Sequence, residues 1–171
     1  MNIQSYIRDI PNFPKEGIIF KDITPLLNNA EARNEVLKIF IENLPKDVKI
    51  DKVVGVESRG FFFGILLAQE LGVGFVPIRK KGKLPFDVIS ATYDLEYGTD
   101  IVEMHIDAID KGENVLIHDD VLATGGTMKA VTEMIEQLGG NIVQINFLME
   151  LDFLKGREKI KDYEVYSILN Y

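Results

Sequence analysis

The stretch VLIHDDVLATGGT, Val115 to Thr127, sets the pattern from which the rest of the chain can be interpreted. Its first three residues are an apolar run, which is typical of a strand buried in a parallel sheet. Two adjacent acids, Asp119 and Asp120, come next, and the small residues 123–127 then form a loop. Apolar residues recur every three or four positions after the loop until a pair of glycines, which predicts a helix. The order is therefore strand, acids, glycine loop and helix.

This order predicts a phosphate site. The N–H groups at the start of a helix have no partner within the helix, and they lie at the positive end of its dipole. Gly125 and Gly126 let the backbone approach a bound group closely, while Thr124 and Thr127 add hydroxyl donors. Ligands of open α/β sheets bind beyond the carboxyl ends of the strands, where this loop is expected. Since the two acids can accept hydrogen bonds from sugar hydroxyls, the expected ligand is a phosphorylated sugar.

Two common phosphate loops do not match the chain. It lacks a G-x-x-x-x-G-K-[ST] motif, and Gly72–Pro77 carries proline where a dinucleotide fingerprint needs its third glycine. Residues 115–127 instead resemble the phosphoribosyl diphosphate (PRPP) motif of the type I phosphoribosyltransferases. The resemblance implies that Asp119 and Asp120 hold the ribose 2′ and 3′ hydroxyls. It implies a 5′-phosphate site made of Ala123, Thr124, Gly125, Gly126 and Thr127. A plain strand–turn–helix with two surface acids is the alternative.

The length and composition of the chain predict a single soluble domain. The chain has 171 residues, of which 46% are hydrophobic and 27% charged, so we expect one domain over residues 1–171. It has no cysteine, which excludes a cysteine nucleophile, and its two histidines are too few for a histidine-built zinc site. A net charge of −8 argues against nucleic-acid binding. No signal peptide or membrane span is visible, so we expect a cytoplasmic location without membrane association.

Strand and helix patterns alternate along the chain. Strands are predicted at 52–56, 73–78, 115–117, 141–151 and 164–169, with a helix at 60–71 and a hairpin at 88–105. Such alternation favours an α/β fold whose mostly parallel sheet is flanked by helices. The resemblance implies the Rossmann-like core of the type I phosphoribosyltransferases, with a flexible catalytic-loop hairpin. Residues 1–30 and 150–171 fit the alternation poorly, and we expect them to pack together as a small hood over the site.

A cluster of positive charge stands out in this acidic chain. Residues 79–83 place four cations among five residues, directly after a predicted strand. A solvated charged loop is the alternative, as for any charge run. Its place at the end of a strand favours a site for the pyrophosphate of PRPP, with Arg79, Lys80 and Lys83 as ligands and Gly82 as a hinge. Mg²⁺ is the expected cofactor, bound through PRPP oxygens and water rather than by a protein cage.

The segment Glu57-Ser58-Arg59-Gly60 follows the first strand of the core. It resembles the family loop that receives pyrophosphate through backbone groups, in which a non-proline peptide bond is often cis. The resemblance implies that the bond between Glu57 and Ser58 is the cis candidate, and that Glu57, Ser58 and Arg59 contact pyrophosphate. A surface ion-pair role is the alternative for Arg59.

Blocks along nearly the whole chain resemble the adenine phosphoribosyltransferase family in order and spacing. The blocks are 12–14, 17–23, 57–61, 79–85, 93–98 and 154–158. The resemblance implies an adenine site in which Ile19 reads the base through its backbone and Phe20 and Leu151 enclose the ring. It also places Lys21 and Arg59 at the base. It implies that Glu96 moves the purine proton as the catalytic residue and that Tyr97, beside it, contacts pyrophosphate.

The resemblance implies purine salvage: adenine and PRPP give AMP and pyrophosphate through an oxocarbenium-like transition state. It also implies a homodimer. Two departures are Lys21, where arginine is frequent, and Phe86, where polar residues are common. Several alternatives stay open. The enzyme could act on another base, or the chain could be a non-enzymatic PRPP sensor of the same fold. Glu96 and Tyr97 could be hairpin-turn residues, and Phe20 and Leu151 could be core residues.

Overall fold

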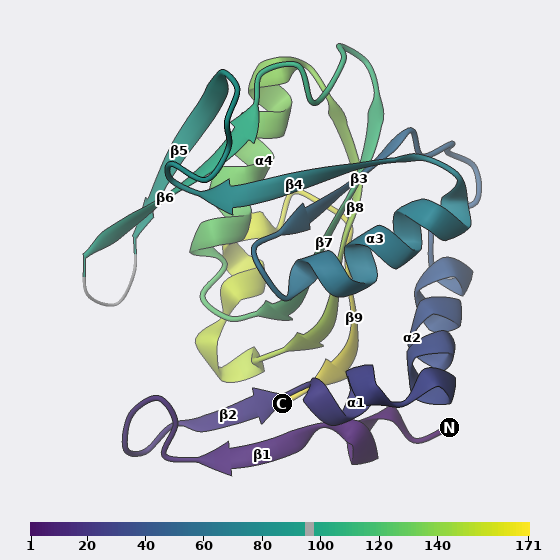
Figure 1. Ribbon diagram of the computed structural model, residues 1–171, viewed down its shortest axis with the longest axis vertical. Coiled ribbons are helices and arrows are strands. Elements are labelled where there is room, and N and C mark those ends of the chain that lie inside the picture. The colour runs from purple at the N-terminus through teal and green to yellow at the C-terminus, as the bar shows by residue number, and fades with distance from the viewer. Residues whose placement is uncertain (95–97) are drawn as a thin grey trace. The chain divides into compact units, whose positions relative to one another are not determined.

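The computed structural model describes residues 1–94 and 98–171 (Figure 1). Its contacts divide the chain into two compact units, Met1–Glu42 and Asn43–Tyr171. No helix in the described part of the chain is long and apolar enough to cross a membrane. The predicted hood, which would join residues from both units, stays a prediction.

The first unit is a small hairpin followed by helices. After the 3₁₀ turn η1 (Ile3–Tyr6), strands β1 (Arg8–Pro11) and β2 (Ile19–Asp22) pair antiparallel, and α1 (Thr24–Asn28) and α2 (Ala30–Glu42) follow. The side chain of Asn29 accepts a hydrogen bond from the N–H of Ala32 at 2.9 Å. It thereby satisfies one of the unpaired N–H groups at the start of α2, as an N-cap does.

The second unit holds a seven-stranded sheet in the order β5-β6-β4-β3-β7-β8-β9. The strands are β3 (Lys52–Val56), β4 (Gly74–Lys80), β5 (Val88–Asp94), β6 (Thr99–His105), β7 (Asn114–Leu122), β8 (Asn141–Glu150) and β9 (Val165–Asn170). All pairs from β4 to β9 in this order are parallel, and β5 and β6 add an antiparallel hairpin at one edge. The mostly parallel α/β sheet is therefore confirmed.

Helices cover both faces of this sheet. Successive residues of a strand point to opposite faces. In β7, the ring of His118 lies against Phe63 of α3 (Gly60–Leu71). Its neighbour Ile117 instead belongs to the apolar cluster that includes Val131 of α4 (Gly126–Leu138).

Two predicted bounds were wrong: β7 continues past the acids to Leu122, and the helix after the loop begins at Gly126. Hydrogen bonds to β8 carry the strand further than the apolar run indicates.

The loop between β7 and α4 rests on a second backbone segment. A methyl group added to Gly125 would lie 2.4 Å from the carbonyl oxygen of Gly156, and one added to Gly156 would lie 2.2 Å from that of Ala123. Gly156 begins the 3₁₀ turn η3 (Gly156–Ile160), which follows η2 (Asp152–Leu154). Arg157 secures this turn, since its Nε donates to Glu150 Oε1 at 3.0 Å and its Nη1 to the carbonyl of Val165 at 2.9 Å. Backbone therefore packs directly on backbone beneath the glycine loop.

This contact predicts that Gly156→Ala is strongly destabilising. The added methyl group would overlap the Ala123 carbonyl, and overpacking of this kind costs roughly 3 kcal/mol at the upper end of its usual range. Gly74→Ala is the matched control, because the nearest atom to its added methyl group is a lysine side-chain carbon at 3.9 Å. Denaturant unfolding would measure both free energies. Equal stability of the two variants would contradict the packing described here.

Candidate active site

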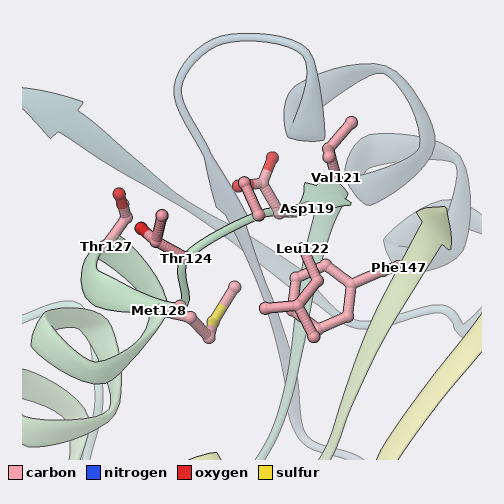
Figure 2. A pocket seen from close by; sticks show the side chains of 9 residues that line it. Asp119, Val121, Leu122, Thr124, Thr127, Met128 and Phe147 are labelled. Carbon is pink, nitrogen blue, oxygen red and sulfur yellow. The ribbon is translucent and has the colours of Figure 1, made fainter. Parts of the chain in front are cut away.

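A small cavity lies at the carboxyl end of β7 (Figure 2). Asp119 lines it together with the glycine loop, including Thr124, Gly125 and Thr127, and Phe147 of β8 adds an apolar wall. Its volume is about 70 Å³, which suits one small anionic group better than a whole drug-sized ligand. The structure therefore brings one of the two predicted acids and the predicted phosphate loop to the same cavity.

The loop presents the amino end of α4 to this cavity. Gly125 has a positive φ of 76° and precedes the first helical residue, Gly126. A left-handed conformation at this position is easily adopted by glycine and strained for residues with a side chain. Helix geometry leaves the first N–H groups of α4 without partners inside the helix. Together with the hydroxyls of Thr124 and Thr127, these N–H groups can hold a phosphate.

The two acids face different surroundings. Asp119 is half-buried and accepts a hydrogen bond from the N–H of Asp120 at 2.8 Å. Asp120 is buried, and its Oδ2 lies 2.7 Å from Nε of Arg59. Burial and the charge of Asp120 raise the pKa of Asp119. Burial also raises the pKa of Asp120, although the Arg59 guanidinium opposes that rise. Two carboxylates thus lie close together in surroundings that disfavour their charge.

The segment that carries Arg59 lies directly beside the acids. A methyl group added to Gly60, the first residue of α3, would lie 2.9 Å from Oδ1 of Asp119 and 3.0 Å from the carbonyl of His118. The absence of a side chain at Gly60 therefore lets the turn after β3 reach β7. The peptide bond between Glu57 and Ser58 is cis, so that prediction is confirmed.

Glu57 gathers the cations of the basic loop. Its Oε2 accepts hydrogen bonds from Nε of Arg79 at 3.1 Å and from the N–H of Lys80 at 2.8 Å. Its Oε1 accepts one from the amine of Lys83. Burial acts to raise the pKa of Glu57, but the hydrogen bonds from Lys83, the Lys80 N–H and Arg79 outweigh it and lower the pKa to about 2. Glu57, directly after β3, is therefore in contact with three of the predicted pyrophosphate residues, Arg79, Lys80 and Lys83.

Strand β6 supplies two further acids to this loop. The amine of Lys80 pairs with Asp100 and also donates to the hydroxyl of Tyr93 at 2.6 Å. Burial acts to lower the pKa of Lys80, but these hydrogen bonds raise it. Glu103 accepts a hydrogen bond from the N–H of Gly82 at 2.8 Å. Sequence reasoning missed both acids, because the pairing of β6 with β4 leaves no local signal. Gly156 was also missed, although it lies in a block that resembles the family.

The residues predicted to bind the base lie in both units. Ile19 and Lys21 are on β2, where the side chain of Ile19 is exposed and Lys21 pairs with Asp9 at 2.7 Å. Phe20, between them, packs edge-on against the ring of Phe13. Leu151 follows β8, and its N–H donates to the carbonyl of Leu122 at 2.9 Å. Glu96 and Tyr97 lie outside the described residues.

The side chains that could bind a metal ion are few at this site. Within residues 1–94 and 98–171, there is no group of three or more His, Cys, Asp or Glu side chains that could hold a metal ion. Asp119 and Asp120 are hard oxygen donors beside the cavity. Mg²⁺ is commonly held by one or two carboxylates together with substrate phosphates and water. The site therefore suits a metal ion that arrives with an anionic substrate.

Comparison with known proteins gives a consistent family. The model of the phosphoribosyl transferase domain matches residues 22–170. An adenine phosphoribosyltransferase of Flavobacterium johnsoniae is 71% identical over 171 residues, with 100% of both chains covered. The crystal structure of the Thermoanaerobacter pseudethanolicus enzyme of that name matches with a TM-score of 0.95 at 49% identity, covering 99% of this chain and 98% of that one.

A second solved structure carries ligands. The adenine phosphoribosyltransferase of Saccharomyces cerevisiae, complexed with an imino-altritol bisphosphate and adenine, matches with a TM-score of 0.93 at 48% identity. The alignment covers 96% of this chain and 95% of that one. Fold, motif order and full-length identity agree, and the chain belongs to the adenine phosphoribosyltransferase family.

Proposed function

We propose that this chain transfers the phosphoribosyl group of PRPP to adenine, giving AMP and pyrophosphate in purine salvage. The observation that carries the proposal is the cavity in which Asp119 and the glycine loop meet. The loop can hold the 5′-phosphate through the N–H groups and hydroxyls of residues 123–127. Asp119 can accept a hydrogen bond from a ribose hydroxyl, and so can Asp120 if its contact with Arg59 rearranges.

The second anion site takes the pyrophosphate. Arg79, Lys80 and Lys83 supply positive charge, and the backbone of residues 57–59 supplies polar groups beside it; Tyr97 is a further proposed ligand. Mg²⁺, when bound with PRPP, adds charge neutralisation for the leaving pyrophosphate. Two separated anion sites would hold the ribose in a fixed orientation, which lowers the entropy cost of reaching the transition state.

Bond breaking runs ahead of bond making in the proposed reaction. The bond between C1′ and the pyrophosphate oxygen loosens, and positive charge develops on the sugar. Purine N9 then attacks C1′ from the opposite face and inverts it. Glu96 takes or returns the purine proton, and Ile19, Phe20, Lys21, Arg59 and Leu151 hold the base. The cations around Glu57 stabilise the charge of the leaving group as it forms.

A panel of bases tests the proposed reaction. With PRPP and Mg²⁺, we expect pyrophosphate release with adenine, and rates at least about a hundredfold lower with guanine, hypoxanthine and orotate. A site that hydrogen-bonds its base rejects analogues whose donors and acceptors are misplaced. Comparable turnover with another base would overturn the choice of adenine. PRPP binding without turnover of any base would favour a sensor.

Asp119→Asn separates stability from binding. Because the pKa of Asp119 is raised, the folded protein binds this proton more tightly than the unfolded chain, so the carboxyl group makes the fold less stable at pH 7 than at low pH. We expect the variant to have a higher free energy of unfolding at pH 7, and the gain to shrink as the pH falls. We also expect PRPP to bind roughly tenfold to hundredfold more weakly, since a charged acceptor is lost.

Urea unfolding at pH 7 and pH 5, with calorimetric titration of PRPP, would measure both effects. Asp107→Asn is the matched control, because Asp107 is exposed. Unchanged PRPP affinity in Asp119→Asn would remove Asp119 from the site.

We also propose that the chain forms a homodimer through α3. Residues 60–68 of this helix carry no polar side chain: Phe63 and Leu67 are buried, while Phe62 and Ile65 are 46% and 49% exposed. Large exposed apolar side chains that lie together often mark a protein–protein contact. A second copy is the partner proposed here, since α3 begins immediately after Arg59, and a dimer surface at this place adjoins the proposed site.

Ile65→Glu tests this interface. A charge in the middle of an apolar interface is costly, so we expect the variant to have the mass of one 19.3 kDa chain where the parent has the mass of two. Ile106→Glu is the control, because Ile106 has a similar exposure of 45% and lies outside α3. Light scattering during gel filtration would give the masses. A dimeric Ile65→Glu variant would place the interface elsewhere.

A further inference from the structure

The two carboxylate oxygens of Glu57 hold their partners differently. Oε2 is fixed by two groups at the end of β4, the Lys80 N–H at 2.8 Å and Arg79 Nε at 3.1 Å. Oε1 accepts from the amine of Lys83, which lies on the loop beyond Gly82. The Glu57 side chain is only 11% exposed, whereas that of Lys83 is 47% exposed. The acid is therefore fixed in place, and Lys83 is the partner with freedom to move.

The loop has the geometry to let Lys83 move. Gly82 has a positive φ of 78°, and a methyl group added to it would meet no atom beyond its chain neighbours within 4 Å. The loop backbone before it is held by the hydrogen bond from the Gly82 N–H to Glu103 at 2.8 Å. The Lys83 N–H donates to the carbonyl of Lys80 at 3.3 Å, so the turn is held on both sides of Gly82. Rotation about the bonds of the long Lys83 side chain can redirect its amine while Arg79 and Lys80 keep their places on β4.

We propose that Glu57 acts as a built-in competitor of pyrophosphate: its carboxylate and the bound pyrophosphate exchange the Lys83 ammonium between them. This inference rests on the proposed function, because it concerns the leaving group of that reaction. A cation already paired with a carboxylate has less to gain from a second anion, and the fixed negative charge of Glu57 repels pyrophosphate nearby. Glu57 therefore weakens pyrophosphate binding and speeds its release.

Glu57→Gln tests the exchange. Glutamine keeps an acceptor for the Lys80 N–H and removes the charge. We expect magnesium pyrophosphate to bind at least about tenfold more tightly, as one lost like-charge contact of about 1.4 kcal/mol would give. If release limits turnover, kcat falls while the KM for PRPP falls with it, a pattern that a general loss of structure does not produce. Pyrophosphate binding should also become more sensitive to salt, because more positive charge is available to it.

Glu103→Gln is the matched control. It removes one buried negative charge from β6, beside the same loop, and keeps an acceptor for the Gly82 N–H. Because Glu103 contacts the loop backbone rather than Lys83, we expect pyrophosphate affinity within about threefold of the parent. A double-mutant cycle with Lys83→Ala locates the effect, because the gain of Glu57→Gln should vanish when the exchanged cation is absent. Glu57→Asp serves if Glu57→Gln does not fold, since the shorter acid keeps its charge but cannot reach Lys83 as well.

The outcomes separate this inference from the proposed function. Calorimetry with magnesium pyrophosphate measures the exchange, and AMP formation by the parent protein measures the function. If the parent forms AMP and Glu57→Gln binds pyrophosphate equally or more weakly, Glu57 positions the cations and does not compete, and the inference alone fails. If the parent forms no AMP with adenine, the proposed function fails whatever the variant binds.

Discussion

The contact between two glycine backbones, at Gly125 and Gly156, is the constraint on which the site depends. The carbonyl of Gly156 lies where a side chain at position 125 would stand, and the carbonyl of Ala123 lies where one at position 156 would stand. The two segments can approach this closely only because both positions are glycine. The lower segment is fixed in turn by Arg157, which bridges Glu150 on β8 and the carbonyl of Val165 on β9. The phosphate loop thus takes its shape from the sheet through two layers of main chain rather than from its own sequence alone.

The charged side chains around the site are arranged in pairs of opposite charge. The Arg59 guanidinium faces Asp120, Arg79 and Lys83 face Glu57, and Lys80 faces Asp100. Each of these cations is close to a carboxylate of the second unit, so concentrated positive charge is compatible with an acidic chain. The same pairing means that substrate anions meet cations that already have partners. The affinity for a substrate anion then depends on how much more strongly these cations bind the anion than they bind their carboxylate partners.

Much of the second unit could be predicted from sequence, because its signals are local. The apolar run, the acids, the glycines and the helical period of residues 115–138 each constrain the next element, and the basic loop follows a recognisable strand. The pairing of β6 with β4 could not be predicted, since it joins residues far apart in sequence, such as Arg79 and Glu103. Asp100 and Glu103 were missed for that reason. The role of Gly156 depends on a contact with Ala123 and Gly125 that no periodicity reveals.

Alternation along β7 has a consequence for how this site can change. Asp119 opens onto the cavity while Asp120 turns toward Arg59, so the two neighbours are not interchangeable copies. The register of β7 against β8 shifts between Val115 and Leu116, ahead of both acids. After that shift, the side chains of β7 alternate regularly between the two faces of the sheet. Deleting or inserting one residue between the shift and the acids would turn Asp120 rather than Asp119 toward the sugar. Deleting or inserting two residues would keep the present alternation.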